Sequence, residues 1–123
     1  VVRCLLNDDP AQAQRARALL AGHEVWVSTT VLLESEWVLR GAAGLDRNRV
    51  HHALTRFLGL ANVQVEAPQR VALALEWLTK GMDFADALHL AAAEEQQCEA
   101  FASFDRRLAA AAKKAKAGRV KNL

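Results

Sequence analysis

Short β-rich segments alternate with helical segments along this chain, and that alternation limits the fold more than any other feature. The strand candidates are Glu24–Val27, Asn62–Glu66, Glu99–Phe104 and a final edge strand over Arg119–Leu123. Helical segments of ten or more residues separate the candidates, which is the length that crossovers between parallel strands need. The sequence therefore predicts an α/β fold with a short parallel sheet covered by helices on both faces.

Capping residues, prolines and glycines mark the ends of the intervening helices. Asp9 precedes Pro10 at a helix start, Ser28 and its neighbouring threonines supply capping hydroxyls, and Gly81 stops a helix. The predicted helices cover Ala11–Ala21, Val31–Arg40, Arg47–Leu60, Pro68–Lys80, Phe84–Gln97 and Arg106–Ala117. Asp46, Asp83 and Asp105 are each placed to cap one of them.

Length and composition restrict the classes of protein that remain. A chain of 123 residues with 52% apolar and 24% charged residues is typical of one globular domain, which we expect over residues 1–123. The longest uncharged runs, Val25–Leu33 and Phe57–Val65, are too short to span a bilayer. Two cysteines without zinc-site spacing suggest the reducing cytoplasm as the compartment.

Basic residues gather at the C-terminal end although the net charge is only +2. Seven of them lie between Arg106 and Lys121, and no acidic residue follows Asp105. Such a segment is either the solvated face of an amphipathic helix or a surface that contacts phosphates, and charge alone does not choose between the two.

Two glutamates in the helix predicted over Val31–Arg40 invite different interpretations. Glu36 precedes Arg40 by four residues, so we expect an exposed ion pair with no further role. Glu34 has Val31 and Trp37 as helical neighbours, an apolar stripe that we expect to face the protein. A carboxylate there needs a compensating cation, either in a salt bridge or as a bound metal.

Three aspartates stand where helices begin. Asp83 and Asp86 open one helix and Asp105 opens another directly after a predicted strand. Capping explains each of them singly. Ligands of open parallel sheets bind beyond the carboxyl ends of the strands, so we expect Asp105, Asp86 and Glu34 to cluster there. Carboxylates without His or Cys suit Mg²⁺ or Mn²⁺, and the corresponding chemistry is phosphoryl transfer.

Four segments together resemble the pattern of a known family, and Asp105 follows Asp86 by nineteen residues as that pattern has it. The segments are Asn7-Asp8-Asp9-Pro10, Thr30-Val31-Leu32-Leu33-Glu34 with Trp37-Val38-Leu39, Asp83-Phe84-Ala85-Asp86-Ala87-Leu88, and Ser103-Phe104-Asp105. The chain resembles a PIN domain, and more narrowly the VapC-type ribonuclease toxins of bacterial toxin–antitoxin pairs. The fold implied is a three-layer sandwich, a short parallel sheet flanked by helices.

The resemblance implies a metal-dependent endoribonuclease. Glu34, Asp86 and Asp105 would bind the metal, Asp83 would act as an accessory ligand through water, and Ser103 would support the site. The implied cofactor is Mg²⁺, with Mn²⁺ as a substitute. It would activate a water for attack on RNA, leaving 5′-phosphate and 3′-hydroxyl ends.

Implied partners are the RNA substrate, a VapB-type antitoxin and a second copy of the chain, with no membrane. Leu33, Trp37 and the apolar residues of Val1–Leu6 would form an apolar groove for the antitoxin. In the family a first strand ending in an aspartate precedes the segment that matches Val1-Val2-Arg3. We therefore expect the domain to be N-terminally incomplete as written, and its activity to depend on the upstream residues.

Two other functions compete with this interpretation. The first is a degenerate PIN module that binds proteins without cutting RNA. The second is a receiver-like signalling domain, which is also small, α/β and acidic at its strand ends. Asn62–Pro68 contains no aspartate to end a middle strand, which disfavours the receiver-like domain.

Overall fold

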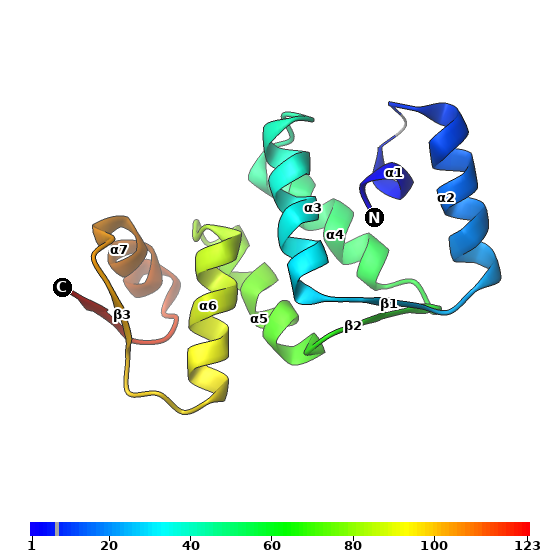
Figure 1. Ribbon diagram of the computed structural model, residues 1–123. Coiled ribbons are helices and arrows are strands. Elements are labelled where there is room, and N and C mark those ends of the chain that lie inside the picture. The colour runs from blue at the N-terminus through cyan, green and yellow to red at the C-terminus, as the bar shows by residue number, and fades with distance from the viewer. Residues whose placement is uncertain (7) are drawn as a thin grey trace. The chain divides into compact units, whose positions relative to one another are not determined.

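The computed structural model describes residues 1–6 and 8–123 (Figure 1). Asn7, part of one of the family-like segments, lies outside the described residues. The chain divides into two compact units, Val1–Glu66 and Ala67–Leu123. Within the described ranges, no helix has the length and apolar composition that a membrane crossing requires.

The described residues of the first unit form four helices and two strands. They are α1 (Val2–Leu5), α2 (Pro10–Gly22), β1 (Val25–Val27), α3 (Thr29–Gly41), α4 (Arg47–Leu58) and β2 (Val63–Val65). β1 and β2 pair in parallel, with Val25 opposite Val63 and Val27 opposite Val65. The connection through α3 and α4 is the helical crossover that the sequence predicts. Only α1, a single turn, was not predicted.

The second unit contains three helices and two strands. They are α5 (Pro68–Thr79), α6 (Phe84–Glu95), β3 (Phe101–Ser103), α7 (Arg106–Ala115) and β4 (Val120–Asn122). β3 and β4 are also parallel, with Phe101 opposite Val120 and Ser103 opposite Asn122. The predicted α/β class with parallel strand pairing is confirmed. The described strands form two two-stranded sheets where the sequence predicts one short sheet. Each strand is three residues long, shorter than its predicted segment.

Side-chain caps set the starts of most of these helices, as predicted. The carboxylates of Asp9 and Asp46 accept the backbone N–H of Gln12 and Arg49, and the Ser28 hydroxyl accepts that of Val31. A cap of this kind stabilises a helix by about 1 kcal/mol. Gly81 follows α5 with a φ of +103°, a conformation that favours glycine.

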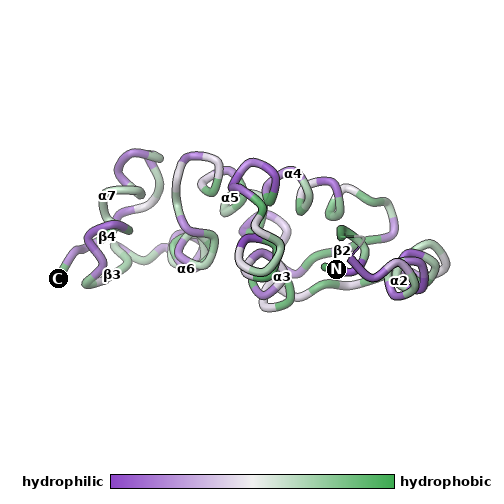
Figure 2. The backbone as a smooth tube through the Cα atoms, turned by 90° about the horizontal axis from the view of Figure 1, so that it is seen from above, coloured by the Kyte–Doolittle hydropathy of each residue, from purple (hydrophilic) through white to green (hydrophobic). Residues whose placement is uncertain are grey.

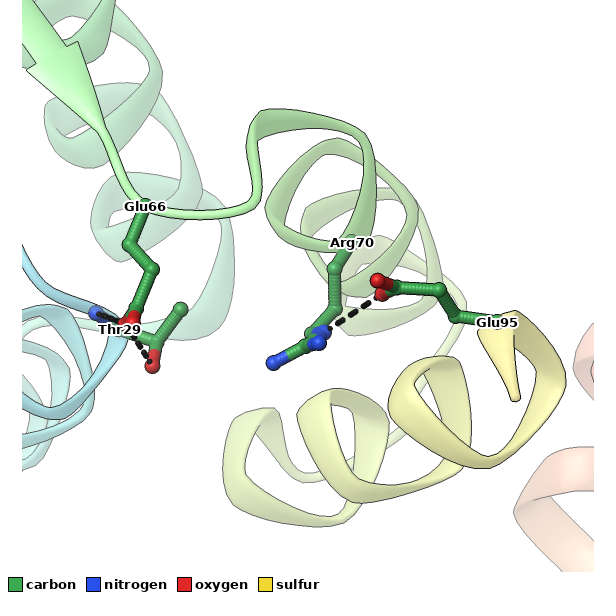
Figure 3. Close-up of polar contacts among 4 residues, drawn as sticks. All are labelled: Thr29, Glu66, Arg70 and Glu95. Carbon is green, nitrogen blue, oxygen red and sulfur yellow. Dashed lines mark hydrogen bonds and ion pairs between the residues drawn. The ribbon is translucent and has the colours of Figure 1, made fainter.

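Two polar contacts, one in each unit, connect neighbouring elements (Figure 3). In the first unit the backbone N–H and hydroxyl of Thr29 both donate to Glu66 Oε1, at 2.9 and 2.8 Å. This joins the start of α3 to the residue that follows β2. In the second unit Arg70 Nε donates to Glu95 Oε2 at 2.9 Å, which ties the start of α5 to the end of α6.

The orientation of α3 corrects one prediction. Its buried face consists of Leu32, Ser35, Glu36 and Leu39. The ion pair between Glu36 Oε1 and Arg40 Nε forms as expected, at 2.8 Å, but Glu36 is 2% exposed rather than solvated. The stripe of Val31 and Trp37 is exposed instead, and so is Glu34. Leu32 and Leu39 determine the buried side of α3. Glu36 is buried with them, and the Arg40 guanidinium compensates its negative charge.

Candidate functional site

The start of α6 presents two carboxylates from a firmly anchored turn. Met82 and Phe84 are fully buried and hold the backbone on either side of Asp83. Asp83 caps the helix, with its Oδ2 accepting the backbone N–H of Asp86 at 3.3 Å. Asp86 therefore projects from the first turn, where the helix dipole favours negative charge. Asp83 is exposed and Asp86 is half-buried.

Asp105 stands at the turn between β3 and α7. Its Oδ1 accepts the backbone N–H of Arg107 at 2.8 Å and of Leu108 at 3.3 Å. Ser103, the last residue of β3, accepts the backbone N–H of Asp105 through its hydroxyl at 3.0 Å. This bond fixes the backbone that carries the Asp105 carboxylate. The role that the geometry gives Ser103 is positioning Asp105.

Electrostatics link the three aspartates of the second unit. The pKa of Asp86 is raised above its ordinary value of 3.8, first by burial and then by the negative charges of Asp83 and Asp105. The charges of Asp83 and Asp105 thus reach the Asp86 carboxylate and disfavour its ionised form. The ionised Asp86 is thus held in an unfavourable environment at neutral pH, and a bound cation would relieve it.

His89 is a further titratable residue beside Asp86. It follows Asp86 by one helical turn, and its charge partly offsets the rise in the pKa of Asp86. Its ring stacks on Phe101 of β3, with centroids 6.3 Å apart and planes 3° from parallel. The stack joins the helix that carries Asp86 to the strand that leads to Asp105. The three-residue spacing from Asp86 is the signal in the sequence that indicates His89.

Glu34 belongs to the first unit, where its neighbours are a basic residue, an acidic residue and apolar side chains. It lines a hollow of about 700 Å³ together with Arg3, Asp8 and apolar residues of α1 and α3. Arg3 Nη1 pairs with Asp8 Oδ2 at 2.7 Å, and this contact lowers the pKa of Asp8. The exposed Glu34 carboxylate is accessible to a ligand. Its convergence with the three aspartates stays a prediction.

The donor chemistry of the aspartates fits a hard divalent cation. Within either unit, the described residues form no group of three His, Cys, Asp or Glu side chains close enough to hold a metal ion between them. Asp86 and Asp105 nevertheless offer carboxylate oxygens, the ligands that Mg²⁺ and Mn²⁺ prefer, and Mg²⁺ usually keeps several waters. The negative charges of the two carboxylates attract such an ion, and its binding would relieve the repulsion between them.

Comparison with known proteins identifies a family. A model of the PIN domain family matches residues 1–114 of this chain. Searches of curated proteins and of solved structures give no significant match. The matched range contains Glu34 and all three aspartates, and it ends within α7.

Proposed function

The chain belongs to the PIN domain family, and from that premise we propose that it is a divalent-metal-dependent endoribonuclease. PIN domains are generally metal-dependent nucleases, so a nucleic-acid substrate and a divalent metal follow from the family itself. The observation that carries the proposal is the position of Asp86, half-buried in the first turn of α6 and within reach of two like charges. Its pKa is raised first by burial and then by the charges of Asp83 and Asp105. Ionised carboxylates that repel one another cost free energy, and a bound cation offsets that cost. Such an arrangement is therefore typical of a functional site.

Each residue of the site has a distinct role in this proposal. Asp86 and Asp105 would hold Mg²⁺ or Mn²⁺ directly, together with Glu34, and Asp83 would act through a bound water. Once bound, the ion would polarise the scissile phosphate and lower the pKa of the attacking water. Ser103 holds the Asp105 backbone by the hydrogen bond to its N–H. The cap bonds of Asp83 and Asp105 keep both carboxylates in fixed orientations.

We further propose that the protein is a VapC-type toxin that acts in the cytoplasm as a homodimer and is neutralised by an antitoxin. The exposed apolar side chains of α3 support a protein partner, since Trp37 is 66% and Val31 44% exposed. An arginine of the antitoxin would pair with the carboxylates and displace the metal by charge compensation. The arginine and the metal would compete for the same negatively charged carboxylates.

Cleavage of RNA tests the proposal. Incubation of the full-length protein with a 5′-labelled single-stranded RNA and millimolar Mn²⁺ should give discrete fragments, and excess EDTA should stop their formation. The new ends should be 5′-phosphate and 3′-hydroxyl, because a metal-activated water attacks the phosphate in line. Cyclic phosphate ends, or equal cleavage in EDTA, would contradict the proposal. Absence of cleavage under all metal conditions would instead favour the non-catalytic, protein-binding PIN module.

A further inference from the structure

The C-terminal part of the second unit carries a surface of unpaired positive charge, here called the basic edge. It consists of Arg106, Arg107, Lys113, Lys114, Lys116, Arg119 and Lys121. All seven side chains are exposed, and none forms an ion pair with any residue in the described ranges. No acidic residue lies among them or after them. A purely solvated face usually mixes both signs of charge, so this bias favours an anionic ligand.

The basic edge extends over α7, the turn that follows it and β4. Leu108, Ala112 and Ala115 form the buried side of α7. By helical periodicity the four basic residues of α7 lie together on the opposite side. Lys121 continues the series on β4, where it pairs with Ala102 of β3. Figure 2 shows hydrophilic residues in α7 and along β4. The series begins directly after Asp105, the proposed metal ligand.

An exposed aromatic ring stands beside the same aspartate. Phe104 is 80% exposed, more than the other large apolar side chains found exposed in the described residues. It lies between Ser103 and Asp105, which are joined by the hydrogen bond from the Asp105 N–H to the Ser103 hydroxyl. An aromatic ring next to a basic track is the combination with which proteins bind single-stranded nucleic acid, since bases stack on the ring while cations follow the phosphates.

We propose that Phe104 and the basic edge bind the RNA strand, with the ring stacked on an unpaired base beside the scissile phosphate. The cations of α7 and β4 then contact the phosphates that lead away from Asp105. This inference rests on the proposed nuclease function and specifies its substrate, an RNA with an unpaired nucleotide at the cut. A fully paired RNA offers no free base face, so Phe104 contributes little to binding it.

Binding measured without metal separates this inference from catalysis. The probe is a short fluorescein-labelled single-stranded RNA, titrated by anisotropy in EDTA at about 50 to 200 mM salt. Phe104→Leu should weaken binding about tenfold at every salt concentration, because it removes stacking and no charge. Lys113→Gln with Lys114→Gln should lower the salt slope by about 1.4, since each lost phosphate contact contributes about 0.7. Arg15→Gln with Arg49→Gln removes two exposed charges from the first unit and serves as the matched control.

The outcomes distinguish the two proposals. The inference requires that Phe104→Leu binds a fully paired duplex, made of the same strand and its complement, as well as the parent does. Equal affinity of all variants for single-stranded RNA would overturn it, even if the protein cuts RNA in Mn²⁺. Binding that depends on Phe104 and the lysines, without any cleavage in Mn²⁺, would support it and overturn the nuclease function. Poly-glutamate serves as a second probe that stands in for an acidic protein. If the lysine substitutions weaken binding to poly-glutamate but not to RNA, the basic edge binds an acidic protein and the inference fails.

Discussion

Asp86→Asn should abolish metal-dependent RNA cleavage, with a loss of about 100-fold or more, and should at the same time stabilise the metal-free protein. The first effect follows because the substitution removes a metal-binding charge at nearly constant volume. The second follows from the raised pKa of Asp86, which means that its ionised form destabilises the fold at neutral pH. Cleavage assays and thermal melting of the same two proteins measure both effects.

The difference in stability between Asp86→Asn and the parent should depend on pH, in a direction that the raised pKa of Asp86 determines. Because the pKa of Asp86 is higher in the folded state, its favourable contribution is complete below the ordinary value of 3.8 and is lost as the pH rises through the folded value. The thermal midpoint of Asp86→Asn should therefore exceed that of the parent at pH 7, by a modest margin because solvent screens the half-exposed group. The gain should disappear at low pH.

A matched carboxylate outside the cluster controls for a general charge effect. Glu99 is exposed and forms no ion pair with any residue that the structure describes. Glu99→Gln should leave cleavage unchanged. If Asp86→Asn cuts RNA as well as the parent, or if Glu99→Gln loses activity equally, the role assigned to Asp86 is wrong.

Phe84→Ala should destabilise the protein by about 3 to 5 kcal/mol, a large part of the stability of a domain of this size. Phe84 is fully buried and lies between Asp83 and Asp86, so it anchors the turn that carries both carboxylates. Phe104→Ala makes the same chemical change at an exposed position and should cost no more than about 0.5 kcal/mol. Urea unfolding followed by circular dichroism measures both. Equal losses would contradict the account of how α6 is anchored.

The helices were predictable because local chemistry determines where they begin. Asp46, Asp83 and Asp105 cap the helices that the sequence assigns to them, through bonds within three residues along the chain. The short strands were predicted at the right places but were expected to be longer. Their ends depend on which residues find a partner strand, and that depends on contacts far apart in sequence.

The side of α3 that becomes buried was not predictable from its own residues. Val31 and Trp37 make one side as apolar as the side formed by Leu32 and Leu39, and only packing within the fold selects the second. The buried pair of Glu36 and Arg40 follows from that choice. The spacing of Asp83 and Asp86 indicated a shared turn, and the place of Asp105 after a strand led us to expect it near Asp86. That its charge raises the pKa of Asp86 could be found only from the three-dimensional arrangement.

The most direct test of the central claim, that the aspartates of the second unit hold the catalytic metal, is a Mn²⁺ titration followed by electron paramagnetic resonance. Free Mn²⁺ gives a sharp signal that weakens as the ion binds, so the measurement does not depend on RNA or on turnover. The parent and Glu99→Gln should bind Mn²⁺ with the same affinity, and Asp86→Asn should bind it at least about tenfold more weakly. Identical titrations of the parent and Asp86→Asn would contradict the claim.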